Sequence, residues 1–228
     1  MGQEKVEEKS NEITAIPKLL DSLDISDAVV SIDAIGTQTK IAEKIVEQGG
    51  HYFLSVKRNQ QSLLDDMEHA FKVNKGTVFT DEIESNHGRI ETRQCSMLPA
   101  KDYLLEENIQ AWKQVATLIK IQANREIKGI LHQETRYYIS DEEVTQPAYY
   151  NSLARGHWGI ENHLHWHLDV TFKEDACRAR VGNAPLNLST IRKFALQLLS
   201  NRKDKHSLKK RQYKAALDME YMNKILNF

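Results

Sequence analysis

Apolar and polar positions follow two different periods along the chain, and each change of period marks an expected helix or strand. Residues 13–23 and 37–48 carry apolar side chains at helical spacing, and a Gly-Gly pair ends the second segment. Residues 28–36 and 51–57 are apolar runs rich in β-branched and aromatic side chains. Continuous runs of this length are typical of strands that are buried on both faces. Together they predict a βαβ unit with two parallel strands.

The middle of the chain changes to the alternation that is typical of strands. A helical pattern over 60–73 is followed by alternating apolar and polar residues over 77–98, around a His-Gly turn signal. Residues 115–140 predict two further strands around a turn that contains glycine. Helical patterns return over 146–173 and 184–199. We therefore expect an α/β chain with a β-rich middle and a helical C-terminal part.

Composition places the chain among globular proteins, with 40% hydrophobic and 28% charged residues in 228 positions. The formal net charge of −1 hides an asymmetry. From residue 178 onward, twelve Lys and Arg face three acidic residues, whereas the first 177 residues carry 19 basic and 29 acidic side chains. A basic end on an acidic body favours contact with nucleic acid, and a solvated charged helix is the alternative interpretation.

Several classes of protein are excluded by simple features of the sequence. No apolar run approaches the 18 or so residues of a membrane span, and the charged N-terminus lacks the apolar core of a signal peptide. The two cysteines, Cys95 and Cys177, are too few for a disulfide scaffold. We expect an intracellular protein that keeps both thiols reduced.

Asp33 is the first candidate for chemistry, because it ends the first predicted strand. Ligand and metal sites gather at the carboxyl ends of strands in open α/β sheets. The alternative is a carboxylate that caps the turn or helix that follows.

The densest group of chemical side chains is RGHWGIENHLHWHLDVTFKED, residues 155–175. On a helix, His157, Glu161 and His165 lie on one face. A carboxylate on this helix could share a divalent cation with Asp33. A zinc site is a second hypothesis, although the histidine spacing does not suit it, and an amphipathic packing helix is a third.

Seven segments together resemble one known family: EKSNEITAIPKLLDSLDI, SIDAIG, GGHYFLSVKRNQ, HGRIETR, TRYYIS, RGHWGIENHLHWHLDVTFKED and GNAPLNLSTIR. In this order they resemble the H-repeat-associated insertion-sequence (ISAs-type) transposases, and the resemblance covers residues 8–228. These are DDE transposases with a ribonuclease-H-like core and an Asp-Asp-Glu set of carboxylates. By position, Asp33 resembles the second Asp and Glu161 the Glu. The 128 positions between them leave room for an insertion.

The resemblance implies a metal-dependent enzyme that cuts and transfers DNA strands. The expected cofactors are two Mg²⁺ or Mn²⁺ ions, held by Asp33 and Glu161 among others, because hard cations prefer oxygen ligands. The implied partners are the insertion-sequence ends, the target DNA and another copy of itself or a full-length transposase. No membrane is involved, and the expected location is a bacterial cytoplasm, in association with the nucleoid.

The resemblance also implies a division of the chain. The expected parts are a partial ribonuclease-H-like core (1–76), a β-rich insertion (77–141), core helices with Glu161 (142–200) and a basic helical tail (201–228). The family's first strands and first Asp have no match in this sequence. We therefore expect an N-terminally truncated member that is inactive alone. The alternative is a non-catalytic remnant that binds DNA or a transposase and interferes with transposition.

Further positions match the family with less defined roles. His157 and Asn162 flank Glu161, and DNA positioning and carboxylate support are both open for them. Lys57, Asn59 and Gln60 follow the second predicted strand, where polar groups contact phosphates, or where Asn59 caps the next helix.

Two basic groups complete the set of expected DNA contacts. His87, Arg89 and Arg93 belong to the β insertion, where cross-strand ion pairs are the competing interpretation. Three residues of the tail are expected to neutralise phosphates, with a solvated helix end as the alternative: Lys209, Lys210 and Arg211.

Overall fold

The computed structural model describes most of the chain, namely residues 12–82, 84–86, 89–127, 129–143 and 146–226. The chain forms two compact units, Met1–Arg155 and Gly156–Phe228, and each is described by itself. The first unit contains all of the strands that the structure describes. It also takes in the start of the segment that we assign from sequence to the C-terminal core helices. The four-part division of the chain stays a prediction.

The first unit begins with the predicted βαβ arrangement. Its elements are α1 (Glu12–Asp21), β1 (Val29–Ile32), α2 (Thr39–Glu47) and β2 (His51–Val56). The two strands are parallel, with Val29 opposite His51 and Ile32 opposite Leu54, which confirms the prediction. One face of α2 is buried through Ile41, because apolar residues at helical spacing share a face.

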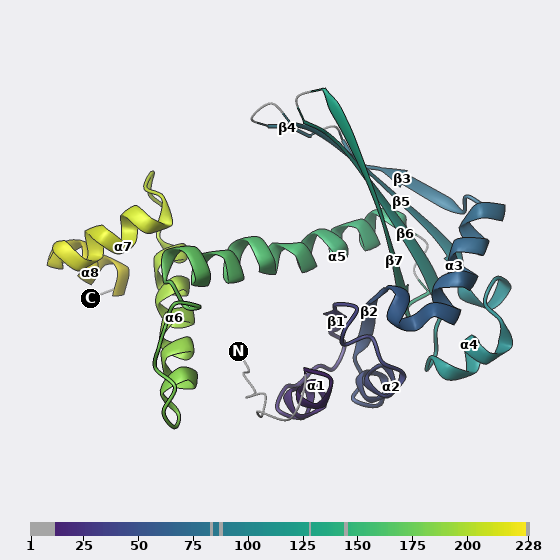
Figure 1. Cartoon of the computed structure of the whole chain (residues 1–228), viewed down its shortest axis with the longest axis horizontal. Helices are drawn as coiled ribbons and strands as arrows, with labels where there is room; N and C mark the ends of the chain where they lie inside the picture. The colour runs from purple at the N-terminus through teal and green to yellow at the C-terminus, as the bar shows by residue number, and fades with distance from the viewer. Residues whose placement is uncertain (1–11, 83, 87–88, 128, 144–145, 227–228) are drawn as a thin grey trace. The chain divides into compact units, whose positions relative to one another are not determined.

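The β-rich segment extends the same sheet. After β2 come α3 (Gln61–Val73), β3 (Thr77–Thr80), β4 (Glu84–Asn86), β5 (Arg89–Pro99), α4 (Glu106–Ala111), β6 (Thr117–Ile127) and β7 (Ile130–Ser140). The seven strands have the order β1-β2-β7-β6-β5-β3, with β4 paired to β5 (Figure 1). The pair β2–β7 is antiparallel and places Phe53 opposite Ser140. The prediction of a mixed α/β fold is therefore confirmed, and one sheet contains both the parallel and the antiparallel strands.

Helices cover both faces of the inner half of this sheet. On one face, Leu54 packs in a core with Met67 and Phe71 of α3. On the other, Phe53 packs with Tyr150 of α5 (Pro147–Ile160), and their rings stack with centroids 6.2 Å apart. β2 is buried on both faces, which explains why its sequence is continuously apolar rather than alternating.

The segment between β5 and β6 contains a helical region that periodicity did not predict. A short 3₁₀ turn (Ala100–Asp102) leads to α4, which has only six residues. Asn108 of α4 is buried, and its amide donates to Ser62 and Asp66 of α3. Polar contacts and the burial of Trp112, rather than an apolar stripe, hold this segment in place.

The second unit is helical. α5 continues into two π-helical segments, Glu161–His165 and His167–Thr171, followed by α6 (Ala184–Asn201), α7 (Leu208–Leu217) and α8 (Met219–Leu226). A small core around Leu199, Tyr221 and Ile225 joins the last three helices. Within the described residues, we find no helix with both the length and the hydropathy of a membrane span.

Candidate functional site

Asp33 follows β1 directly, at the carboxyl end of the strand, and its side chain is exposed. Its Oδ1 accepts a hydrogen bond from the backbone N–H of Gly36 at 3.3 Å. Gly36 leaves no room for a side chain, since a Cβ would collide with Cγ2 of Ile32 and lie 2.6 Å from Cδ1 of Ile16. The residues after β1 therefore form a tight turn that presents the Asp33 carboxylate to solvent. The bond to Gly36 agrees with the turn-capping interpretation of Asp33, and its role as a metal ligand stays a prediction.

Thr37 fixes this turn to the neighbouring strand. Its side chain is fully buried, and its Oγ1 lies 2.7 Å from the carbonyl oxygen of Ser55 and 3.0 Å from that of Asp33. Because Ser55 belongs to β2, the hydroxyl connects the end of β1 to the core of the sheet. Sequence patterns gave no signal for this residue.

The polar residues after β2 hold the same turn from the other side. Asn59 donates from Nδ2 to the carbonyl oxygen of Ala34 at 2.6 Å, and Gln60 donates from Nε2 to that of Thr37 at 2.8 Å. The alternative role for Asn59, a cap on α3, is wrong, because Gln60 occupies the cap position and makes no side-chain cap bond. Lys57 is exposed beside them. Asn59 and Gln60 thus contact the Asp33 turn, and the role of all three residues in binding phosphate stays a prediction.

The helix that leads to Glu161 is anchored near its start. Asp81, just after β3, accepts hydrogen bonds from Nδ2 of Asn151 and from the guanidinium of Arg155, both at 2.9 Å. Burial opposes ionisation of Asp81, but the bonds from Asn151 and Arg155 outweigh it and lower the pKa of this carboxyl. Asn151 and Arg155 lie one helical turn apart, which is the only sequence signal of this contact.

Glu161 begins the first π-helical segment, directly after α5. The side chains of Glu161 and Asn162 lie outside the described residues. His157, one turn earlier, is half-buried, and its ring meets that of Trp158 edge-on with centroids 6.2 Å apart. Isolated π-helical turns are rare and occur often at functional sites. Asp33 and Glu161 belong to different compact units, so their approach to one cation stays a prediction.

The histidines of this segment do not support the zinc hypothesis. His163 and His165 are exposed, and Nδ1 of His167 lies 3.2 Å from Oγ1 of Thr171. Burial, followed by the nearby His163, lowers the pKa of His167. Among the residues that the structure describes, no three His, Cys, Asp or Glu side chains gather as metal ligands. Asp33 offers one carboxylate to a hard cation such as Mg²⁺. A metal site needs further oxygen ligands beside it.

The basic residues of the β-rich segment are only partly described. His87 and the side chain of Arg89 lie outside the described residues. Arg93 pairs with Glu91 at 2.5 Å, and Glu91 also lies 3.4 Å from Arg125 on the adjacent strand. Glu91 is buried, so these contacts correspond to the ion-pair alternative for Arg93. Its role in binding DNA stays a prediction.

The three basic residues of the tail fall into two environments. Lys209 and Lys210 are exposed on the first turn of α7. Arg211 is largely covered: it donates to Oδ1 and the backbone oxygen of Asp204 and to the backbone oxygen of Leu199, each at 2.9 Å. Arg211 therefore holds the second unit together, whereas the two lysines face solvent.

Asp204 is the centre of this network, and sequence analysis did not identify it. The hydroxyl of Tyr221 donates to Oδ2 at 2.5 Å, and the backbone N–H of His206 donates to Oδ1 at 3.0 Å. These bonds and the guanidinium of Arg211 lower the pKa of Asp204 to about 2, with the Tyr221 bond the largest cause. Nothing in the local pattern predicts this contact between three helices.

Comparison with known proteins identifies the family of the chain. The family described as "Transposase DDE domain" matches residues 1–198. An H repeat-associated putative transposase of Escherichia coli K12, YhhI, is 39% identical over 235 residues, which is 99% of this chain and 62% of that protein. The putative protein YbfL of the same organism gives the same figures. An uncharacterised protein from Xanthobacter autotrophicus is 37% identical over 145 residues, 61% of this chain and 48% of its own length.

This chain thus spans about 62% of the length of the transposase-like relatives that match nearly all of it. The family match covers most of the chain and includes Asp33, the π-helical turn at Glu161 and the strands between them. The resemblance that the motifs indicate is confirmed: the chain belongs to the DDE transposase family.

Proposed function

We propose that this chain is part of a DDE transposase with a ribonuclease-H-like core that cuts and rejoins DNA with divalent metal ions. The observation that carries the proposal is the fixed turn at Asp33 within a chain that matches the DDE domain. An exposed carboxylate at the carboxyl end of a core strand is where such a family needs a metal ligand. DNA is the partner that membership of the family implies.

Asp33 and Glu161 would hold the metal, and Asp33 is the better defined of the two. When bound, Mg²⁺ or Mn²⁺ would stabilise negative charge on the attacking and leaving oxygens of a phosphodiester. The protein supplies rigidity: Thr37 and Asn59 fix the backbone on either side of Asp33, so that little reorganisation of the turn is needed when a cation arrives. Asn151 and Arg155 anchor the helix that leads toward Glu161.

The remaining polar residues have proposed roles in the same site. His157 and Asn162 support Glu161 or contact DNA, and Lys57 and Gln60 face the phosphates beside Asp33. Because only two carboxylates match the Asp-Asp-Glu set, we expect the 228-residue chain alone to bind metal weakly and not to transfer strands.

Two measurements test the proposal. The concentration of free Mn²⁺, followed by electron paramagnetic resonance during a titration, should show weak binding that Asp33→Asn and Glu161→Gln each reduce. Asp65→Asn, on the exposed side of α3, serves as the control. Mn²⁺ binding that survives both substitutions would refute the assignment of the site.

The second measurement is DNA binding by fluorescence anisotropy, together with nicking in Mg²⁺ or Mn²⁺. Binding that weakens with salt and the absence of nicking by this chain are the expected results. Nicking that Asp33→Asn abolishes would show that another carboxylate replaces the missing one. If the chain binds DNA but Asp33→Asn does not change Mn²⁺ binding, the alternative is favoured, namely a non-catalytic remnant that interferes with transposition.

A further inference from the structure

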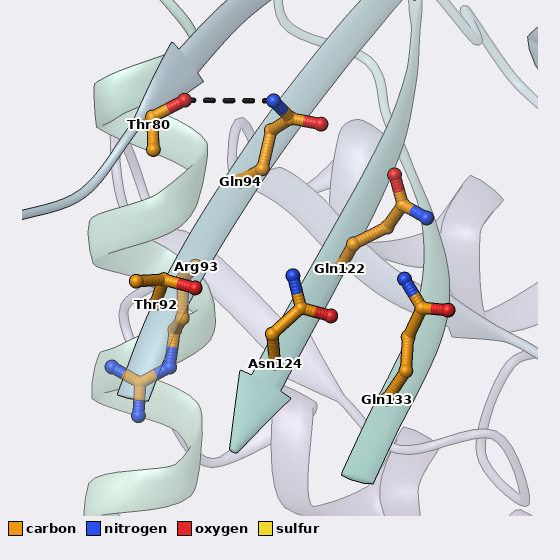
Figure 2. Close-up of a pocket in the computed structure, with 7 residues that line it drawn as sticks. All are labelled: Thr80, Thr92, Arg93, Gln94, Gln122, Asn124 and Gln133. Carbon is orange, nitrogen blue, oxygen red and sulfur yellow. Dashed lines mark hydrogen bonds between the residues drawn. The ribbon is translucent and has the colours of Figure 1, made fainter. Parts of the chain in front are cut away.

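Neutral hydrogen-bonding side chains gather on one face of the outer part of the sheet. We call it the amide face, and it consists of Thr80, Thr92, Gln94, Gln122, Asn124 and Gln133. Figure 2 shows these side chains on four strands, β3, β5, β6 and β7, around a hollow of about 160 Å³. Arg93 lines the hollow too, and its guanidinium pairs with the buried Glu91.

The strand register places the amides in rows. Gln94 lies opposite Gln122, and Thr92 lies opposite Asn124, which in turn lies opposite Gln133. Neighbouring strands are about 4.8 Å apart, so β5 to β7 span about 10 Å. The DNA major groove is about 12 Å wide and admits a two-stranded β-ribbon, and the antiparallel pair of β6 and β7, which carries Gln122, Asn124 and Gln133, is such a ribbon.

These amides are available for a partner. The bond from Gln94 Nε2 to Thr80 Oγ1 is long, at 3.5 Å. Within the described part of the chain, the side chains of Gln122, Asn124 and Gln133 make no hydrogen bond. Donors and acceptors therefore lie side by side on half-buried or exposed side chains, without competing partners among the described residues.

The opposite face of the same strands is chemically different. There Glu91 pairs with both Arg125 and Arg93, the residue that also borders the hollow, and Arg125 lies 3.8 Å from Glu134. Charges on that face are largely satisfied within the protein. The neutral face offers little attraction to phosphates but can form paired hydrogen bonds with base edges, as Asn and Gln do with adenine.

We propose that the amide face reads base edges in the major groove of the DNA that this transposase binds. The inference rests on the proposed function, because it takes DNA as the partner. It separates two tasks: the amide face supplies sequence discrimination, whereas exposed lysines such as Lys209 and Lys210 supply affinity that depends on salt. Substitutions on this face should then change which sequence is bound but not the salt dependence.

The experiment uses the full chain and a pool of duplexes with 20 random base pairs. Selection with the wild type identifies a preferred duplex, and anisotropy then compares this duplex with a scrambled one at several salt concentrations. The test variant replaces Gln122, Asn124 and Gln133 by Thr, which keeps the β-propensity but removes paired hydrogen bonding. Gln110→Thr, on the exposed surface of α4, is the matched control, and circular dichroism checks folding.

We expect the triple variant to lose about 10-fold or more of the preference for the selected duplex, with an unchanged salt slope and unchanged affinity for the scrambled duplex. Single substitutions, Gln122→Thr or Asn124→Thr, should give smaller losses and serve if the triple variant does not fold. An unchanged preference would overturn the inference while leaving DNA binding intact. An equal loss of affinity for both duplexes would also overturn it. So would a loss of self-association, measured by sedimentation, with no change in the preference for the selected duplex. Failure of the wild type to bind any duplex would instead refute the proposed function.

Discussion

The side-chain amide of Asn59 donates to the backbone oxygen of Ala34 at 2.6 Å, and this bond joins the turns that follow the two parallel strands. Ala34 is buried and immediately follows Asp33. One of the hydrogen bonds that hold this candidate metal ligand in position therefore comes from a residue 26 positions away in the sequence.

Asn59→Ala should therefore affect both stability and metal binding. Removal of the amide leaves the oxygen of Ala34 with only the longer bond from the backbone N–H of Thr37, at 3.3 Å, so the free energy of unfolding should fall by about 0.5–1.5 kcal/mol. Urea denaturation measures this loss. The freed turn should also weaken the part of Mn²⁺ binding that depends on Asp33, measured by titration well below the unfolding transition.

Asn108→Ala is the matched control for this variant. Asn108 is a buried amide that bonds to Ser62 and Asp66 rather than to the Asp33 turn. Because Asn59 is exposed and Asn108 is buried, we expect a loss of stability at least as large for Asn108→Ala, with unchanged Mn²⁺ affinity. If the two variants bind Mn²⁺ equally, Asn59 has only a structural role.

Gly36→Ala tests the tightness of the same turn. The added methyl would overlap Ile32 and crowd Ile16, so the free energy of unfolding should fall by about 1–3 kcal/mol. Gly156 in α5 has nothing within 4 Å of an added Cβ, and Gly156→Ala should stabilise by about 0.5–1 kcal/mol. Thermal unfolding of both variants would reveal the opposite signs. A neutral Gly36→Ala variant would show that the turn is looser than the structure indicates.

The sequence predicted the parallel strands, and Asp33 at the end of the first of them, because the information there is local. An apolar run such as residues 51–57 has few alternatives to a buried strand. Pairing between β2 and β7 joins Phe53 to Ser140, and local periodicity does not record a partner 87 positions away. The antiparallel strands were thus predicted as elements, while their union with the parallel pair in one sheet was not.

The contacts of single polar residues were harder to predict for a related reason. Asn59 and Arg211 have ordinary neighbours in sequence, and only the fold decides whether each meets a backbone oxygen, a carboxylate or solvent. From sequence, a basic cluster therefore indicates a role in phosphate binding for all of its members. In the fold, Lys210 is exposed, whereas Arg211 is largely buried against Asp204.

His51 should make stability depend on pH. Its Nδ1 lies 2.8 Å from Oδ2 of Asp141, and this hydrogen bond raises the pKa of His51, against a smaller opposing effect of burial. Stabilisation from the charged histidine is fully present below the unfolded pKa of about 6.5 and is lost as pH rises through the higher folded value. Because the ring is partly exposed, the effect should be small and weaker in high salt.

Urea denaturation of the wild type and of His51→Gln between about pH 5.5 and 8.5 measures this dependence. The difference in midpoint between the two proteins should shrink as pH rises. A constant difference across the range would mean that the proton on His51 contributes nothing. Asp141→Asn should remove the same dependence, although it also alters the bond from the backbone N–H of Tyr52.

The basic tail allows charge and structure to be tested separately. Lys209 and Lys210 are exposed, so replacing both by Ala should leave stability unchanged. The same change should reduce the magnitude of the salt slope of DNA binding by about 2, at about 0.9 per phosphate contact.

Arg211→Ala should behave differently, because it leaves Asp204 with one cation fewer and removes the donor to the backbone oxygen of Leu199. Its main effect should be that α7 and α8 unfold at a lower temperature. Circular dichroism melts and anisotropy at several salt concentrations on both variants distinguish the two roles. If Lys209→Ala with Lys210→Ala leaves the salt slope unchanged, the lysines form a solvated surface, and the charge that binds DNA must lie elsewhere in the chain.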